Sequence, residues 1–277
     1  MPIDATAQTD LAHLLNQTIT SGDASGLEQY LCDNSNLPGP RANLNLIIAF
    51  AKHIADLVRN SDAQGDALAA ILDRWAALDL NAAPVNHPPE MLPACAAASY
   101  GFVAAARPDW RAHEIGKLRR AASDPRWRTR EMVAFGLQQV LMVDWDSTVT
   151  ELRRWLADPD PLVIRAAVTG MADPVVLTDE ARAADGLEMS EQALDWLSAL
   201  PADRRRDEDV KVLRKALGYT LSVAVAALPT PGFEAMRHYA PSTDPDVQRV
   251  IRENLKKNRL RKWPTEVASV SALLSQN

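Results

Sequence analysis

Hydrophobic positions along this chain recur every three to four residues, which is the spacing of one face of an α-helix. In the stretch 44–59 they stand at Leu46, Ile47, Phe50, Ile54 and Leu57, after a turn that contains Pro38 and Pro40. The stretch 66–80 repeats the spacing, and 89–106 is small and apolar on most sides, as in a helix between neighbours. No convincing run of alternating residues bounded by hairpin turns suggests a strand. The pattern predicts an all-α fold.

The second half of the chain contains a repeat. The segments 123–137, 157–171 and 243–255 all open with Asp-Pro and continue with an apolar residue and an Arg. An Asp side chain accepts hydrogen bonds from the free N–H groups at a helix start, and Pro fits the first turn. We therefore expect helices to begin at Asp124, at Asp158 or Asp160, and at Asp244.

Each of these helices has a partner before it in the sequence, at 111–122, 149–157 and 233–240. The interval between the second and third repeats has room for a further hairpin, near 189–200 and 209–227. Paired helices of this kind stack into a solenoid with a concave face. We predict a single α-solenoid domain, 1–277, of about six hairpins, with degenerate repeats in 1–106, clearer ones in 107–263 and a tail at 264–277.

Composition narrows the class of protein. The chain has 277 residues with only 11 Gly and 5% aromatic residues, which favours helix over strand. No window approaches eighteen apolar residues, and no basic flank with an apolar run opens the chain, so we expect a cytoplasmic protein without a membrane partner. The two cysteines make no disulfide framework. The five histidines show no metal-binding spacing and no phosphate-binding Gly loop occurs, so we expect neither a metal nor a cofactor.

Charge is unevenly distributed. Residues 1–100 hold 11 acids and 4 Lys or Arg, a net charge of −7, whereas 101–277 hold 25 acids and 26 Lys or Arg, a net of +1. DNA-binding domains are usually basic overall, so any phosphate contact here must come from a local stripe. The segment 252–263 holds six Lys or Arg and one Glu. Stabilisation of a helix C-terminus and phosphate contact are both open explanations for it.

The Asp-Pro openings resemble those of HEAT repeats, and one subfamily is similar in more detail. The stretch "KVLRKALGYTLSVA" (211–224) resembles the "R-K-A-I-G-W-x-L-R" stretch of the bacterial DNA alkylation repair proteins, which are built from HEAT-like repeats. "WRTREMVAFGL" and "LVIRAAVTGM" are similar to two further helices of that family. The resemblance covers about residues 105–260, with motifs that any HEAT array partly shares.

The resemblance implies a concave, positively lined groove that holds duplex DNA. In the DNA glycosylases of that family, aromatic residues and an Asp lie beside the damaged nucleotide, within a "W-W-D-x-V-D" motif. In the closest stretch here, "DWDSTVTEL" (144–152), Trp145, Asp146 and Val149 match, but Thr150 or Glu151 stands where the second Asp belongs. Ser222 replaces the Arg that ends the other motif. Asp146 and Glu151 are therefore the candidate catalytic residues, and the departures argue against strong catalysis.

Nine residues are candidates for nucleic-acid contact: Trp127, Arg128, Arg130, Trp145, Arg165, Tyr219, Lys256, Lys257 and Arg259. Each type also has a structural explanation. The tryptophans can pack between repeats, the arginines of the repeats can pair with carboxylates of the next repeat, and Asp146 can serve as an N-cap or first-turn acid.

Three functions remain open from the sequence. The first is a repeat protein that binds duplex DNA in a concave groove without strong catalysis. The second is a scaffold for a protein partner, which the acidic N-terminal third favours. The third is a DNA glycosylase acting on alkylated bases. A salt-sensitive cationic surface would separate the first from the second.

Overall fold

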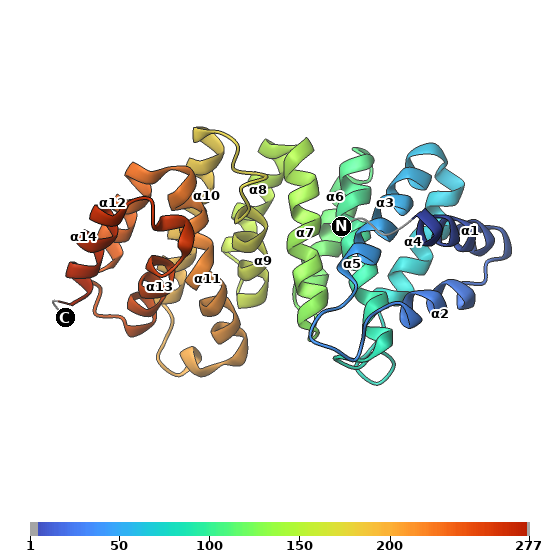
Figure 1. Cartoon of the computed structure of the whole chain (residues 1–277), viewed down its shortest axis with the longest axis horizontal. Coiled ribbons are helices and arrows are strands. Elements are labelled where there is room, and N and C mark those ends of the chain that lie inside the picture. Colours follow the sequence, from blue (N-terminus) through green and yellow to red (C-terminus); the bar gives the residue numbers. More distant parts are fainter. Residues whose placement is uncertain (1–4, 276–277) are drawn as a thin grey trace. The chain divides into compact units, whose positions relative to one another are not determined.

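All regular secondary structure in the part of the chain that the structure describes is helical, which confirms the all-α prediction (Figure 1). The structure is a computed structural model, and it describes residues 5–275. The chain divides into two compact units, the first ending at Val143 and the second beginning at Asp144. Within each unit, successive helices pack against one another as in a stack of helical pairs.

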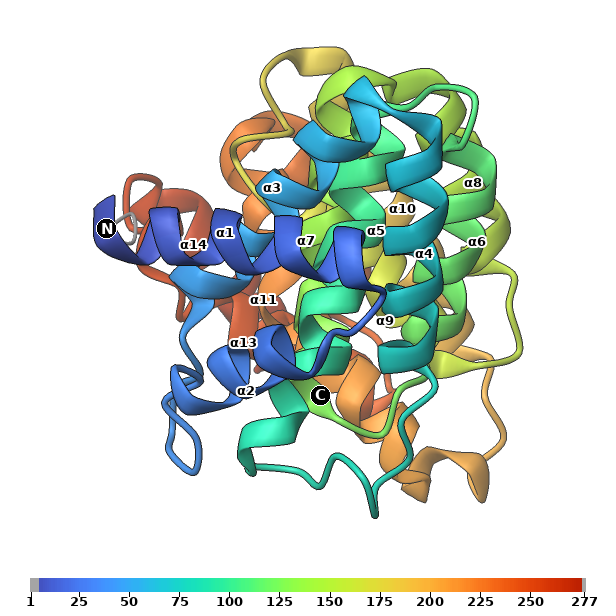
Figure 2. The ribbon, with the colours of Figure 1, turned by 90° about the vertical axis from the view of Figure 1, so that its right-hand side faces the viewer.

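The first unit holds seven α-helices and a short 3₁₀ helix among its described residues. They are α1 (Ala5–Ser21), α2 (Ser25–Asp33), α3 (Leu44–Asn60), α4 (Asp62–Ala76), η1 (Pro88–Glu90), α5 (Met91–Ala106), α6 (Arg111–Ala121) and α7 (Trp127–Val143). Three of these were expected from hydrophobic spacing within a few residues of their observed bounds. Helices α1 and α2 fall in the region predicted as degenerate repeats, and Figure 2 shows α1 crossing in front of the others.

Helix α5 is the centre of the first unit. It packs against α3, α4, α6 and α7, and its residues from Met91 to Ala104 are all buried. Its small side chains permit a very close approach to α7. A Cβ atom added to Gly101 would lie 2.1 Å from the Cα atom of Gly136, so the two backbones touch at this point. The apolar run 89–106 is therefore a helix enclosed on most sides, as its composition indicated.

The second unit also holds seven α-helices among its described residues, with two short 3₁₀ helices. They are α8 (Trp145–Leu156), α9 (Pro161–Met171), α10 (Glu180–Ser198), η2 (Arg204–Arg206), α11 (Glu208–Ala227), α12 (Pro229–Tyr239), α13 (Pro245–Leu255), η3 (Asn258–Leu260) and α14 (Pro264–Leu274). Helix α11 is central here, since it packs against α9, α10, α12 and α13.

The Asp-Pro repeats place helix starts as expected in two of three cases. The side chain of Asp160 accepts a hydrogen bond from the backbone N–H of Leu162 at the start of α9, and Asp244 does the same for Asp246 and Val247 at α13. Asp124 differs, because α7 begins three residues later. Its carboxylate instead holds Arg126, accepting bonds from the backbone N–H (2.7 Å) and from the guanidinium group.

The end of the chain differs from the prediction of a tail. Residues 264–274 form α14, whose Val270 and Leu274 are buried and which packs against α12 and α13. Its start follows Trp263, whose ring lies edge-on to Phe233 at 6.0 Å between centroids. Residues 276–277 of the predicted tail lie outside the described residues. The stack therefore continues one helix further than the Asp-Pro repeats indicated.

Candidate nucleic-acid interface

A groove between α11 and α13 in the second unit is lined mainly by cationic side chains. It has a volume of about 460 Å³. Its lining consists of Lys211, Arg214, Lys215, Gly218, Tyr219, Arg249, Val250, Glu253 and Lys257. Five of these side chains are cationic and one is anionic, so the local charge is +4 in a protein whose net charge is −6. We call it the α11–α13 groove.

The helical period explains why these side chains meet. On α11, residues 211, 214, 215, 218 and 219 follow the spacing i, i+3, i+4, i+7, i+8, which places them on one face. On α13 and just beyond it, Arg249, Glu253 and Lys257 are spaced four residues apart. Because α11 and α13 pack together, the two cationic stripes flank a single groove.

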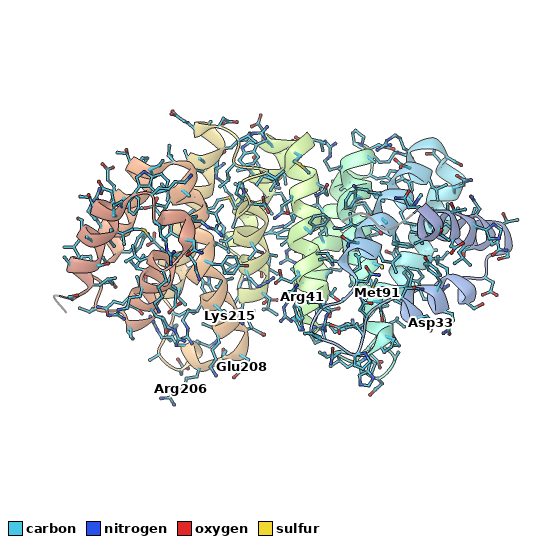
Figure 3. All side chains as sticks on the ribbon, viewed as in Figure 1. Asp33, Arg41, Met91, Arg206, Glu208 and Lys215 are labelled. Carbon is cyan, nitrogen blue, oxygen red and sulfur yellow. The ribbon has the colours of Figure 1, made fainter. Side chains whose placement is uncertain are left out.

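The five cations differ in how they are paired. Arg214 donates to the buried carboxylate of Asp246 at 2.6 Å, and Lys211 pairs with the exposed Glu208. Lys215, Arg249 and Lys257 form no ion pair within residues 5–275. Figure 3 labels Lys215 on α11. Three cations are therefore available to an anion without first losing a carboxylate partner, which makes them the strongest candidates for phosphate contact.

The field of these cations acts on the one acid in the groove. The pKa of Glu253 is lowered, first by the hydrogen bond that Lys256 donates to it at 2.7 Å, and further by the charges of Lys257 and Arg249. Its carboxylate is thus held ionised by its neighbours. It neutralises part of the groove, and the remaining charge is still clearly positive.

Buried polar contacts fix the two walls of the groove. The fully buried Asn254 of α13 donates its amide to the carbonyl oxygens of Leu217 (2.7 Å) and Val250 (2.8 Å), and it accepts from the N–H of Ser222. Gly218 lies inside this bridge. A Cβ atom there would be 3.2 Å from Cβ of Glu253, so glycine permits the close contact of α11 with α13. The groove lining is therefore held on rigid elements.

A second network fixes the start of α13. Arg205 donates to Asp244 at 2.8 Å and also to the carbonyl oxygens of Ser198 and Leu200. Asp244 caps α13, while Asp246 in the first turn holds Arg214. The carboxylates near the groove mouth are thus committed to structural arginines, and they leave the three unpaired cations uncompensated.

Two predicted nucleic-acid residues are buried. Arg128 is 6% exposed, and its guanidinium donates to Glu90 at 2.8 Å and to the carbonyl oxygen of Gly39 at 2.7 Å. Arg165 on α9 is also 6% exposed. Their burial fits the other explanation given for the repeat arginines, in which the side chain makes contacts inside the protein and not with phosphate. Neither belongs to the groove.

The candidate catalytic residues, Asp146 and Glu151, lie in α8, where the contacts of Glu151 and of the neighbouring Trp145 serve the packing of the protein. Glu151 accepts from Arg154 at 2.7 Å and from the indole of the buried Trp155 at 3.1 Å. Asp146 is exposed in the first turn of the helix, next to Trp145. The indole N–H of Trp145 donates to Asp185, and Arg182 lies over its ring at 4.8 Å. Trp145 is therefore engaged in packing α8 against α10.

The other predicted residues divide between the groove and the surface. Tyr219 and Lys257 line the groove. Lys256 pairs with Glu253, and Arg259 is exposed on η3. Arg130 donates to the backbone carbonyls of Asp124 and Pro125, and Trp127 is exposed at the start of α7. The basic segment 252–263 therefore spans the end of α13, η3 and the approach to α14, and only part of it faces the groove.

Sequence reasoning missed Lys215 and Arg249 as site residues. The spacing of Lys211, Arg214, Lys215 and Tyr219 was readable as one helical face. Arg249 was not linked to that face, because only packing of α13 on α11 brings it there.

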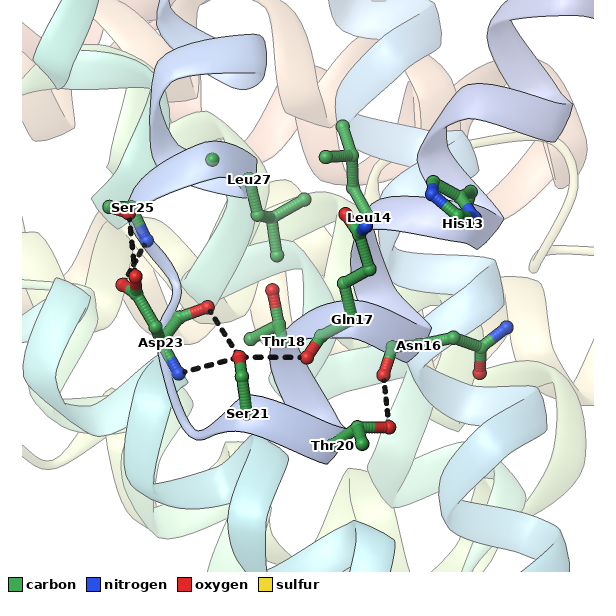
Figure 4. Close-up of a pocket in the computed structure, with 11 residues that line it drawn as sticks. His13, Leu14, Asn16, Gln17, Thr18, Thr20, Ser21, Asp23, Ser25 and Leu27 are labelled. Carbon is green, nitrogen blue, oxygen red and sulfur yellow. Dashed lines mark hydrogen bonds between the residues drawn. The ribbon is translucent and has the colours of Figure 1, made fainter.

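A larger cavity of about 610 Å³ surrounds the turn between α1 and α2 (Figure 4). Its polar groups bond to one another: Asp23 accepts from the backbone N–H and the hydroxyl of Ser25, and Ser21 donates to the carbonyl oxygen of Gln17. The bond from the N–H of Ser25 holds the pKa of Asp23 below its usual value. The hydrogen bonds of Ser21, Asp23 and Ser25 therefore stabilise the turn between α1 and α2.

Residues 5–275 contain no group of three or more His, Cys, Asp or Glu side chains arranged to hold a metal ion. None of the described helices has the length and apolar character that a membrane span needs.

Comparisons with known proteins add little. No family model matches the chain, and no curated protein is similar to it. Among solved structures, an engineered protein determined by the Northeast Structural Genomics Consortium is similar with a TM-score of 0.38 and 16% identity, over 95% of this chain and 97% of that one.

Proposed function

We propose that this chain is a HEAT-like repeat protein that binds duplex DNA through the phosphate backbone, with the α11–α13 groove as its principal contact. The supporting observation is the convergence of Lys215, Arg249 and Lys257, none of them ion-paired within residues 5–275, on one groove beside Tyr219. The resemblance of 211–224 to the alkylation repair proteins falls on the same helix. The groove is too small to enclose a duplex, so it contacts one edge of the backbone.

The charge arrangement sets the expected strength of binding. Three free cations release about three condensed counterions on a duplex, so log K falls with log salt at a slope of about −2.7. Between 50 and 200 mM salt the affinity should fall about 40-fold on that slope. The remainder of the chain has a net negative charge, which opposes the approach of a duplex away from local cationic sites.

A pair of matched triple variants tests the proposal. Fluorescence anisotropy of a labelled 20-base-pair duplex is measured for the wild type and for Lys215→Ala, Arg249→Ala and Lys257→Ala combined. The control combines Arg59→Ala, Arg154→Ala and Arg204→Ala, three cations at least half exposed and paired with acids three residues away. Both triples remove three positive charges.

We expect the groove triple to lose at least tenfold in affinity at 50 mM salt and most of the salt dependence, because the counterion-releasing contacts are gone. The control triple should stay within about twofold to threefold, which is the share of net charge alone. Equal losses in both triples, or no binding by the wild type at 50 mM salt, would refute the proposal.

Base excision forms no part of the proposed function. A glycosylase needs a carboxylate near the sugar on which positive charge develops. Glu151 is committed to Arg154 and Trp155, and Asp146 adjoins Trp145, from which an adjacent helical residue points about 100° away. We expect no release of alkylated bases from methylated duplex DNA above background. Release that is abolished by Asp146→Asn or Glu151→Gln would contradict this.

A protein scaffold is the second candidate, and one observation favours it. A groove of about 340 Å³ in the first unit, between α3, α5 and α7, is floored by Phe102, Ala105 and Ala106 and rimmed by Lys52 and Arg59. Met142 and Val143 beside it are 40% and 57% exposed. Apolar surface with a charged rim is typical of a protein contact. Failure of the DNA experiment would make this reading the leading one.

A further inference from the structure

Trp127 is exposed to an extent unusual for its size. Its side chain is 45% exposed at the first position of α7 in the first unit, whereas Trp75 and Trp155 are 1% exposed. Exposed tryptophan is uncommon on surfaces that have no partner, because its large ring gains most from burial. The exposed ring of Trp127 is therefore a candidate binding surface.

One face of the Trp127 ring is already held. The guanidinium carbon of Arg128 lies 4.5 Å from the ring centroid. Arg128 itself is immobilised by Glu90 at 2.8 Å, by the carbonyl oxygen of Gly39 at 2.7 Å and by Asn86. Such a cation restrains the orientation of the indole, and Trp127 is still 45% exposed. The exposed part of the ring is a preformed surface for a second planar group, with little ordering cost on binding.

The same anchor holds the segment that carries an exposed cation, Arg41. Arg128 binds Gly39, two residues before the exposed Arg41, and Gly39 in turn donates its N–H to Asn86 at 3.0 Å. Figure 3 labels Arg41. Arg41 forms no ion pair within the described part of the chain. Two acids that pair with Arg128 and its neighbour Arg126 are already engaged, Glu90 by Arg128 and Asp124 by Arg126.

An exposed aromatic ring, and an exposed cation on a segment tied to the same arginine, fit a particular ligand chemistry. A nucleotide whose base is unpaired offers a planar face for the ring and a phosphate for the cation, as in single-stranded nucleic acid binding. A paired base in a duplex has both faces covered by its neighbours. The charge on Arg41 also selects an anionic partner over a cationic one.

We propose that Trp127 and Arg41 form a second nucleic-acid contact, in the first unit, that takes an unpaired nucleotide by stacking its base on Trp127 and pairing its phosphate with Arg41. This inference deepens the proposed function, since it adds single-stranded nucleic acid to the substrate class. It does not depend on how the two units are arranged, because every residue it uses belongs to the first.

The test uses three labelled ligands and the full-length chain. The ligands are a 15-nucleotide oligothymidylate, a sugar–phosphate strand of the same length with abasic sites throughout, and a 15-base-pair duplex. The variants are Trp127→Ala, Trp127→Phe and Arg41→Ala. The control is Met142→Ala, which removes a 40% exposed apolar side chain near the other end of the same helix. Thermal unfolding of each variant checks that it is folded.

We expect Trp127→Ala to weaken binding of oligothymidylate by at least about fivefold, the lower end for loss of one stacked base. Trp127→Phe should recover part of that loss because it restores a ring. Binding of the abasic strand should be the same for Trp127→Ala and the wild type, while Arg41→Ala should weaken both strands. Met142→Ala should change neither.

Three outcomes would overturn the inference: unchanged oligothymidylate binding in Trp127→Ala, an equal loss in Met142→Ala, or an equal loss on the abasic strand. The duplex separates this failure from that of the proposed function. If duplex binding still depends on the α11–α13 groove, the proposed function stands without the Trp127 site. If the wild type binds none of the three ligands, both fail.

Discussion

Helices α5 and α11 hold the same position in their respective units, each at the centre of several packed helices, yet they differ in how much polar surface they expose. Helix α5 buries an unbroken run from Met91 to Ala104 and contributes almost nothing to the surface. Helix α11 buries Leu213, Leu217 and Leu221 on one side and carries Lys211, Lys215 and Tyr219 on the other.

The comparison shows two ways of building the centre of a helical stack. Small side chains let α5 be enclosed by close backbone contact, as at Gly101, and leave it few exposed polar groups. Helix α11 is held to α13 by the buried amide of Asn254 and by the Arg214–Asp246 ion pair, and it keeps a polar face that lines a groove. Packing therefore decides which central helix can carry function.

The largest effect on stability should come from adding a side-chain atom where the backbones of α5 and α7 touch. Gly101→Ala places a methyl group on the backbone of Gly136, and neither helix can move without disturbing the buried α5 core. We expect a loss of about 3 kcal/mol or more in the free energy of unfolding, measured by urea denaturation.

The matched control is Gly116→Ala on α6, where an added Cβ meets only the flexible end of Arg120 at 3.9 Å. This change should stabilise the protein by about 0.5–1 kcal/mol, because alanine favours helix. Similar destabilisation by both changes would show that the contact of Gly101 with Gly136 is not the limiting one.

The corresponding test of α11 is Asn254→Ala. The change removes hydrogen bonds to Leu217 and Ser222 inside a fully buried site, and we expect a loss of about 2–3 kcal/mol. Asn258→Ala, at an exposed position four residues on, should stay within about 0.5 kcal/mol. If Asn254→Ala is equally mild, the hydrogen bonds of Asn254 contribute little to holding α13 against α11.

A smaller effect depends on pH and concerns the polar edge of α5. Tyr100 of α5 donates to Asp73, which pairs with the buried Lys117, and Lys117 also contacts the buried Glu114 at 3.1 Å. Burial raises the pKa of Glu114 above its ordinary value of 4.5, against the opposing charge of Lys117. The folded state thus binds this proton more tightly than the unfolded chain.

As pH rises from 4.5 through the raised pKa, the unfolded chain releases the proton first, so Glu114 lowers the free energy of unfolding over that window. Glu114→Gln should remove this contribution. The change in stability between pH 4.5 and pH 7, measured by urea denaturation, should become more positive in Glu114→Gln than in the wild type. An identical pH dependence in both would contradict the assignment.

The smallest effect on stability is expected on the solvent-exposed face of α11, at Lys215. Lys215 has no ion pair within residues 5–275, so Lys215→Ala should change the free energy of unfolding by less than about 0.5 kcal/mol. Affinity for a duplex should nonetheless fall, because one counterion-releasing contact is lost. Thermal unfolding and anisotropy on the same preparation compare the two. A large loss of stability would assign Lys215 a structural role.

Local signals were sufficient to predict much of the fold. Asp160 and Asp244 act through backbone N–H groups two or three residues away, so their capping roles are readable from sequence. Asp124 was not readable in this way, because its carboxylate is occupied by Arg126. Helix α14 was missed because its start depends on the contact of Trp263 with Phe233, which is 30 residues away in the chain.

The candidate site was harder to predict from the sequence, because it also depends on contacts between residues far apart in the chain. The sequence pointed to Tyr219 and Lys257, but it counted Arg128 among the surface arginines. The partners that bury Arg128, Glu90 and Gly39, lie 38 and 89 residues away, and no local pattern links them. Cations with distant carboxylate partners cannot be separated from free ones until the packing is known.

Asn254 has a consequence for how the stack finds its alignment. Neighbouring helices with similar apolar faces can slide past each other by one turn, about 5.4 Å, at little cost in buried area. A slide of α13 along α11 would carry the amide of Asn254 away from Leu217 and Ser222 and leave it unpaired inside the protein. One polar side chain thus penalises every wrong alignment, in the manner of a single asparagine in a coiled coil. The alignment of α13 on α11 that Asn254 favours therefore also sets how the cations of the α11–α13 groove lie relative to one another.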